Sequence, residues 1–155
     1  MTAPDTPQTQ LPALPALADF PFPTALVVTG APAPDDGVLY ESGDVDEIFP
    51  FASVTKPIVA WSALVAVDRG LLDLDAPAGA PAPDGATIGH LLSHSSGIAA
   101  DSDERLATPG TRRIYSNRGI EILGERLQEA TGTPLETWVE STVLEPLGMA
   151  SVLIP

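Results

Sequence analysis

The sequence of 155 residues is one domain's length, and its hydrophobic residues (44%) are sufficient for a packed core. Its 21 acidic residues against 7 Lys and Arg give a formal net charge of -14, which disfavours binding to nucleic acids and to anionic membrane surfaces. The absence of cysteine excludes disulfides, thiolate metal ligands and a cysteine nucleophile.

The N-terminal region is rich in proline. Residues 1–23 contain six prolines and are expected to form an extended, poorly ordered leader, with one domain over 24–155. Residues 1–10 contain neither Lys nor Arg and no long apolar run, so no secretory signal is visible. The longest apolar stretch, 58–67, is too short to span a bilayer. We therefore expect a cytoplasmic protein with no membrane partner.

Two β-prone runs follow the leader. Residues 24–29 and 38–41 flank a turn-forming segment rich in Gly, Pro and Asp, which predicts an antiparallel hairpin. Residues 44–51 form a connector that is a candidate for another short strand. Two strands alone are marginally stable and leave open sheet edges, so we expect association through such an edge with a second copy or a second chain.

The remaining chain is predicted to be helical. Residues 54–67 are apolar on nearly every face, which is typical of a helix buried on all sides, and Gly70 marks its end. A short helix capped by Thr87 and running to Ser93 follows, and then a polar loop over 99–113. The next helix is amphipathic and ends at Gly132, with apolar residues at helical spacing: Ile120, Leu123, Leu127 and Ala130. A last helix is predicted over 133–144.

The last of these helices has a strong start signal. Thr133 to Glu136 has the spacing of a capping box, with Pro134 at the first helical position. The order of a hairpin followed by helices predicts an α+β fold.

Ser53 and Lys56 form the first candidate catalytic pair. They stand three residues apart at the start of the apolar helix, so their Cβ atoms are expected roughly 5–6 Å apart on one face. Ser53 lies at the positive end of the helix dipole, and an amine that loses hydration becomes a usable base. Lys56 is also the only lysine in the chain.

Tyr115 and Asn117 are the second candidate group, directly before the amphipathic helix. A tyrosine near a lysine ammonium can share its proton, and a nearby amide can hold a substrate carbonyl. Taken alone, Tyr115 is better explained as a half-buried aromatic residue and Asn117 as a helix N-cap.

His90 and His94 are spaced as a pair of metal ligands could be. Zinc hydrolases with this spacing have Glu after the first histidine, whereas Leu91 stands here. Without a third ligand in view, we interpret both histidines as structural and expect neither a metal nor another cofactor.

Four stretches together resemble one family: Phe51–Lys56, Ile88–Gly97, Pro109–Asn117 and Glu145–Met149, in this order. The resemblance is to the serine β-lactamase-like hydrolases, which include class C β-lactamases, penicillin-binding proteins with D-Ala-D-Ala carboxypeptidase activity, and esterases. It covers about residues 24–155. The Tyr-Ser-Asn form favours the class C and esterase branch over class A.

The resemblance implies a role for each candidate residue. Ser53 would attack an ester, β-lactam or D-amino peptide carbonyl and become acylated, with Lys56 accepting its proton. Tyr115 would assist proton transfer to the leaving group, and Asn117 would orient the substrate. The backbone N–H of Ser53 would supply half of an oxyanion hole.

The sequence also departs from the family. Members carry a later strand with Lys-Thr-Gly or His-x-Gly, yet no Lys or His follows Asn117. We therefore interpret the chain as an N-terminal part of the β-lactamase/transpeptidase-like fold that lacks those C-terminal strands, and expect it to be an incomplete catalyst. The alternative is a catalytically silent member that binds a ligand or serves as a scaffold.

Overall fold

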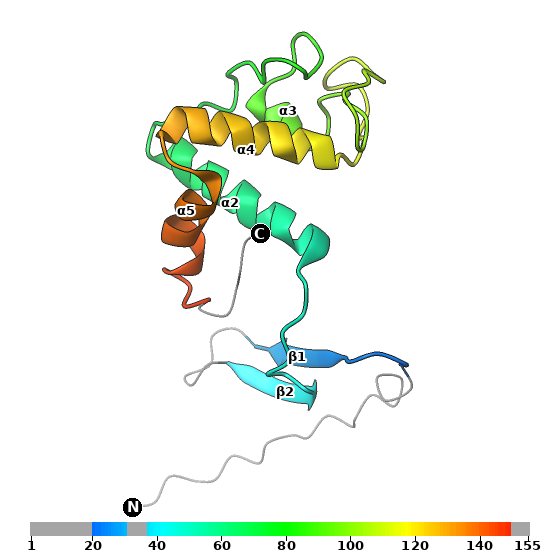
Figure 1. Cartoon of the computed structure of the whole chain (residues 1–155), viewed down its shortest axis with the longest axis vertical. Coiled ribbons are helices and arrows are strands. Elements are labelled where there is room, and N and C mark those ends of the chain that lie inside the picture. Colours follow the sequence, from blue (N-terminus) through cyan, green and yellow to red (C-terminus); the bar gives the residue numbers. More distant parts are fainter. Residues whose placement is uncertain (1–19, 31–36, 150–155) are drawn as a thin grey trace, which may run out of the picture. The chain divides into compact units, whose positions relative to one another are not determined.

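The computed structural model describes residues 20–30 and 37–149 (Figure 1). The chain divides into two compact units, Met1–Pro50 and Phe51–Pro155. Most of the predicted leader lies outside the described residues, and the predicted single domain over 24–155 stays a prediction. Within the described ranges, no helix is long and apolar enough to cross a membrane.

The first unit contains the predicted hairpin. Strand β1 (Ala25–Thr29) pairs with β2 (Val38–Gly43) in an antiparallel two-stranded sheet. The register pairs Ala25 with Gly43, Val27 with Glu41 and Thr29 with Val38. A hydrogen bond of 2.9 Å from the N–H of Gly30 to the carbonyl of Gly37 extends the pairing at the turn end. The candidate strand over 44–51 is wrong, because this segment forms a turn and irregular chain.

The second unit begins with the predicted apolar helix. A short 3₁₀ turn (Ala52–Val54) leads into α2 (Thr55–Asp68), and Gly70 follows its end with φ of 69°. Pro57 lies in the first turn of α2, where an N–H would have no partner within the helix. The predicted helix and its glycine end are therefore confirmed.

Within the part of the chain that the structure describes, helix α2 is buried on one side only, which corrects the prediction that it is buried all round. Val59 and Ala63 face the core, whereas Trp61 and Leu64 are 59% and 44% exposed. The physical reason is that a helix apolar on all faces needs partners on all sides, and α2 makes its helix contacts through one face.

The predicted middle helices are confirmed with nearly the expected bounds. Helix α3 (Ile88–Leu92) is capped by Thr87, whose hydroxyl accepts the N–H of His90. Helix α4 (Asn117–Thr131) ends at Gly132, which has φ of 68°, a left-handed conformation that glycine adopts without strain.

The last helix starts without the predicted capping box. Helix α5 (Leu135–Val139) continues as a π-helical segment (Glu140–Leu144), so its extent agrees with the prediction. Pro134 occupies the N-cap position and makes no side-chain cap. Instead, Gln128 from α4 accepts the N–H of Leu135 at 3.0 Å, because α4 and α5 are in contact and this side chain reaches the helix start.

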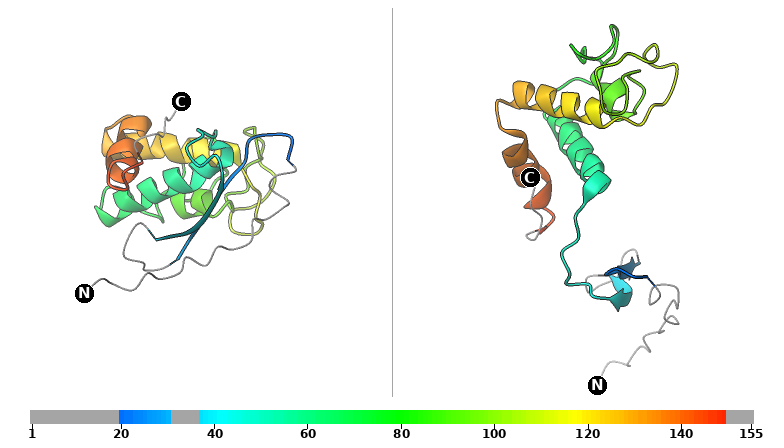
Figure 2. Two further views of the ribbon diagram at one scale, coloured as in Figure 1. Left: turned by 90° about the horizontal axis from the view of Figure 1, so that it is seen from below. Right: turned by 45° about the vertical axis from the view of Figure 1, so that its right-hand side comes forward.

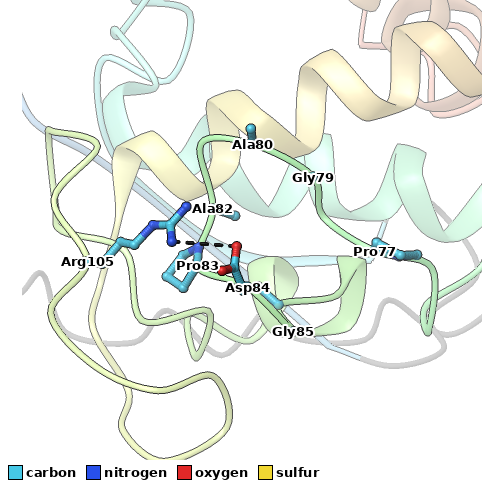
Figure 3. Close-up of a pocket in the computed structure, with 9 residues that line it drawn as sticks. Pro77, Gly79, Ala80, Ala82, Pro83, Asp84, Gly85 and Arg105 are labelled. Carbon is cyan, nitrogen blue, oxygen red and sulfur yellow. Dashed lines mark ion pairs between the residues drawn. The ribbon is translucent and has the colours of Figure 1, made fainter.

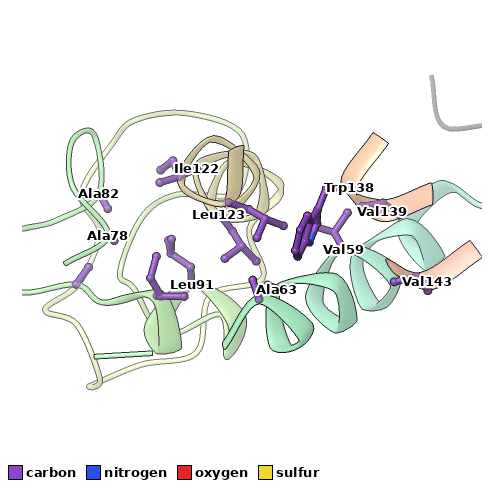
Figure 4. Packing of buried hydrophobic residues seen from close by; sticks show 14 of the residues in the cluster. Val59, Ala63, Ala78, Ala82, Leu91, Ile122, Leu123, Trp138, Val139 and Val143 are labelled. Carbon is purple, nitrogen blue, oxygen red and sulfur yellow. The ribbon is translucent and has the colours of Figure 1, made fainter. Parts of the chain in front are cut away.

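One hydrophobic core joins these helices (Figure 4). Figures 1 and 2 show α4 crossing α2, with α5 packed beside both helices. Trp138 of α5 is buried, and its indole N–H donates to the carbonyl of Ser62 in α2 at 3.0 Å. The core residues include Val59, Ala63, Leu91, Ile122, Leu123, Leu127, Val139 and Val143. This packing fixes the N-terminal turn of α2 relative to the loop before α4.

Candidate active site

Ser53 lies in a strained turn at the start of α2. Ala52, just before it, has φ of 43°, in the left-handed region that residues other than glycine rarely adopt. The N–H of Val54 donates to the carbonyl of Phe51 at 2.8 Å and closes this turn. Ser53 itself is exposed, so a substrate can reach its hydroxyl.

Lys56 contacts the hydroxyl of Ser53. Its Nζ donates to Ser53 Oγ at 3.0 Å, as the spacing of three residues predicted. Lys56 is half-buried while Ser53 is exposed. In this position a neutral Lys56 amine would accept the proton of the serine hydroxyl, because the same pair of atoms is within hydrogen-bond reach.

Tyr115 completes the cluster, although it is 59 positions after Lys56 in the chain. Lys56 Nζ lies 4.9 Å from the centroid of the Tyr115 ring. The hydrogen-bonding interaction with Lys56, followed by that with Ser53, holds the pKa of the Tyr115 hydroxyl below its ordinary value of 10.0. The structure therefore brings three of the four predicted residues together.

Two backbone hydrogen bonds hold the loop that carries Tyr115. The N–H of Ile114 donates to the carbonyl of His94 at 2.7 Å, and the N–H of Ser116 donates to His94 Nδ1 at 3.2 Å. The rings of His94 and Tyr115 also lie 4.8 Å apart at 34°. Sequence reasoning assigned His94 only a general structural role, and no sequence signal linked it to Tyr115.

Asn117 is the first residue of α4, and its side chain is hydrogen-bonded to a residue other than Ser53, Lys56 and Tyr115. Its side-chain amide donates to Asp101 Oδ1 at 2.6 Å. The neighbouring Arg118 binds Asp103 at 2.6 Å, so the loop over 101–103 is attached to the start of α4. Asp101 was missed by sequence analysis, because only tertiary folding brings this loop to Asn117.

Ser116, between the two candidate residues, is buried and serves as the N-cap of α4. Its Oγ donates to the carbonyl of Ala99 at 2.6 Å and accepts the N–H of Gly119 at 2.8 Å. The serine therefore joins the helix start to the preceding loop.

Replacing Ser116 by alanine is expected to lower the free energy of unfolding by about 1–2 kcal/mol, because the cap and a buried hydrogen bond are both lost. Urea unfolding followed by circular dichroism measures this change. Ser102→Ala is the matched control, since Ser102 is exposed. Equal stability of the two variants would contradict the role given to Ser116.

The two histidines take part in local hydrogen bonds. His90 Nδ1 accepts the N–H of Thr87 at 3.1 Å and so completes the cap of α3. Together with the bonds of His94, this agrees with a structural role for both residues. Among residues 20–30 and 37–149, no group of three or more His, Cys, Asp or Glu side chains could hold a metal ion.

A cavity of about 260 Å³ lies between the loop after α2 and the polar loop before α4 (Figure 3). It is lined mainly by small residues and prolines of the segment 77–86. Arg105 and Asp84 form an exposed ion pair of 3.5 Å at this cavity. The residues that line this cavity do not include Ser53, Lys56 or Tyr115.

A Ser–Lys pair at a helix start, with the lysine amine over a tyrosine ring, defines the class of the site as that of a candidate serine hydrolase. The model of the family described as Beta-lactamase matches residues 30–154. This chain belongs to the β-lactamase family. The predicted family resemblance is thereby confirmed.

Curated relatives include both esterases and penicillin-binding proteins. Esterase EstB of Burkholderia gladioli is 36% identical over 148 residues, with 67% of this chain and 38% of the relative covered. Penicillin-binding protein 4 of Amycolatopsis lactamdurans is 31% identical over 147 residues, with 73% of this chain and 39% of the relative covered. The chain thus spans less than half the length of these relatives.

Solved structures agree on the fold. A β-lactamase from Mycobacterium bovis is 46% identical, with a TM-score of 0.77, and the likeness covers 88% of this chain and 48% of that one. The predicted α+β fold of the β-lactamase/transpeptidase type is confirmed, represented here by a hairpin and a helical region.

Proposed function

We propose that the protein is a serine hydrolase that works through an acyl-enzyme on Ser53. The observation that carries the proposal is the 3.0 Å contact between Lys56 Nζ and Ser53 Oγ, with the Tyr115 ring 4.9 Å from the same amine. A nucleophile, a base within hydrogen-bond reach and a third group that orients the base form the general arrangement of covalent catalysis.

In the first half-reaction, Ser53 Oγ attacks the substrate carbonyl while Lys56 accepts the hydroxyl proton. Negative charge develops on the carbonyl oxygen, and the backbone N–H of Ser53 at the helix start is one donor to it. The proton then moves from Lys56 to the leaving group, with the Tyr115 hydroxyl as the relay. The carbonyl–leaving-group bond breaks, and Ser53 remains acylated.

In the second half-reaction, water attacks the acyl carbonyl, the bond between the acyl carbon and Ser53 Oγ breaks, the proton lost by the water passes to Oγ, and the carboxylic acid product leaves. Tyr115 is suited to take a proton from this water, because its lowered pKa makes its phenolate more accessible than that of an ordinary tyrosine. Asn117 lies at the start of α4, and we assign it the orientation of the substrate; Asp101 holds one of its amide hydrogens.

The substrate class is an ester, a β-lactam or a D-amino peptide. The names of the relatives support this range, since they include an esterase, a penicillin-binding protein and a D-alanyl-D-alanine carboxypeptidase/endopeptidase. The chain spans less than half the length of these relatives, so the activity of the whole protein is part of this proposal. The cytoplasmic location and the association through a sheet edge stay predictions.

The test is the intact mass of the chain after incubation with p-nitrophenyl acetate and, separately, with benzylpenicillin. One acyl group per chain, mapped to the peptide that contains Ser53, is the expected result. Ser53→Ala removes the nucleophile and is expected to abolish the adduct, whereas the exposed Ser102→Ala is expected to keep it.

Circular dichroism confirms that each variant is folded before the comparison. A folded chain that forms no adduct with either reagent would contradict acylation by this chain. An adduct that persists in Ser53→Ala would show that another residue is the nucleophile. Ligand binding retained in the absence of acylation would instead favour the silent binding protein.

A further inference from the structure

His94 contacts Tyr115 and both of its neighbours in the chain. Its carbonyl accepts the N–H of Ile114, its ring Nδ1 accepts the N–H of Ser116, and its ring lies 4.8 Å from the Tyr115 ring. The two hydrogen bonds therefore hold the residues immediately before and after Tyr115. The ring and the carbonyl of one residue thus bind the backbone on both sides of the tyrosine.

We propose that His94 is a positioning residue, which holds Tyr115 against Lys56 and Ser53. The consequence for acylation rests on the proposed function, whereas the effect on Tyr115 itself does not. His94 lies two residues after the end of α3 and 21 positions before Tyr115, so it acts from a different element of the fold.

The backbone of His94 supports this role. Its φ is 56°, in the left-handed region, where glycine is the usual residue after a helix. A residue with a large side chain is strained in this conformation, and such strain is retained where the surrounding structure requires it. At His94 the conformation lets the carbonyl and the ring contact the same loop, which a glycine could not do because it has no ring.

His90 shows what a purely local histidine does in the same stretch of chain. Its Nδ1 also accepts a backbone N–H, from Thr87 at 3.1 Å, but this bond closes the cap of α3. Among the described residues, the ring that pairs with Tyr115 is that of His94 and not that of His90. The two histidines therefore make similar hydrogen bonds with different consequences, and His90 offers a matched control.

The hydrogen bond to Ser116 requires an unprotonated Nδ1, so the positioning form of His94 is neutral. Partial burial, followed by the positive charges of Arg113 and Lys56, holds the pKa of His94 below its ordinary value of 6.5. The interaction is therefore present above pH 6.5 and is lost as the pH falls through this lowered pKa. Tyr115 is the other titratable group beside the ring, with 4.8 Å between the two ring centroids.

The first measurement is the pKa of Tyr115, read from phenolate absorbance. The chain contains one other tyrosine, Tyr40, so the difference from Tyr115→Phe isolates the signal of Tyr115. His94→Ala is expected to raise this pKa towards 10.0, because the hydroxyl moves away from Lys56. His90→Gln, the matched control, is expected to leave the titration unchanged.

Two further variants separate the ring from the acceptor. His94→Asn keeps an acceptor near the position of Nδ1 and tolerates a positive φ, so it is expected to recover part of the lowered Tyr115 pKa. His94→Phe keeps a ring but has no acceptor for the N–H of Ser116, and is expected to recover less. These variants also decide the question if His94→Ala does not fold.

The second measurement is the rate of Ser53 acylation by p-nitrophenyl acetate against pH. His94→Ala is expected to lower this rate by about 10- to 100-fold, the cost of displacing a catalytic group. His94→Asn is expected to lose the part of the low-pH decline that protonation of His94 causes, because asparagine does not titrate.

The proposal is overturned if folded His94→Ala has the same Tyr115 pKa as His90→Gln and an acylation rate within about twofold of it. If His94→Ala does not fold, the same result for both His94→Asn and His94→Phe overturns the proposal. The two proposals can also be told apart. If the wild-type chain is not acylated, but the Tyr115 pKa rises in the His94 variants and not in His90→Gln, the proposed function is refuted and the positioning role is kept.

Discussion

Lys56→Met is expected to slow the acylation of Ser53 by about 100- to 10,000-fold, the usual contribution of a general base. The lysine amine is the base in hydrogen-bond contact with Ser53 Oγ, at 3.0 Å, and methionine of similar length cannot accept a proton. The measurement is the rate at which the acylated mass appears after mixing with p-nitrophenyl acetate. Arg112→Met, which removes an exposed cation, is the control and is expected to react at the wild-type rate.

Lys56→Arg separates the charge of Lys56 from its basicity. Arginine keeps a positive charge near Tyr115 but does not become neutral in proteins, so it is expected to acylate as slowly as the methionine variant. The Tyr115 pKa is expected to stay below 10.0 in Lys56→Arg and to rise towards that value in Lys56→Met, because the interaction with Lys56 is the main cause of the lowering. Acylation of Lys56→Met at the wild-type rate would contradict the assignment of the base.

Leu123→Ala is expected to lower the free energy of unfolding by about 2–5 kcal/mol. Leu123 is fully buried in the core between α2 and α4, so its truncation leaves a cavity as well as lost apolar burial. Urea unfolding followed by circular dichroism gives the difference. This packing also fixes the relative position of the elements that carry Ser53 and Tyr115, so we expect acylation to fall with stability.

Leu64→Ala is the matched control, because Leu64 also lies in a helix but is 44% exposed on the outer side of α2. Its expected cost is about 0.5 kcal/mol or less. A loss as large as that of Leu123→Ala would show that the outer face of α2 is covered, for example by association between chains. Analytical sedimentation of the wild-type chain measures its oligomeric state and so tests whether chains associate.

Local sequence signals predicted most of the helices. Gly132 ends α4 because a left-handed residue closes the last turn, and Thr87 caps α3 because its hydroxyl accepts a backbone N–H three residues later. Such signals act over one helical turn and depend little on the rest of the fold. The capping box at Thr133 failed where a side chain from another helix, Gln128, took over the role of the cap.

By itself, the sequence determined the family, the α+β order of elements and the pairing of Ser53 with Lys56, since three positions on a helix are neighbours in any fold. Only the tertiary structure decided that the Lys56 amine lies over the Tyr115 ring and that His94 binds the backbone next to Tyr115. The physical reason is distance along the chain: the packing of α2, α3 and α4 brings these residues together, and no local pattern encodes that packing.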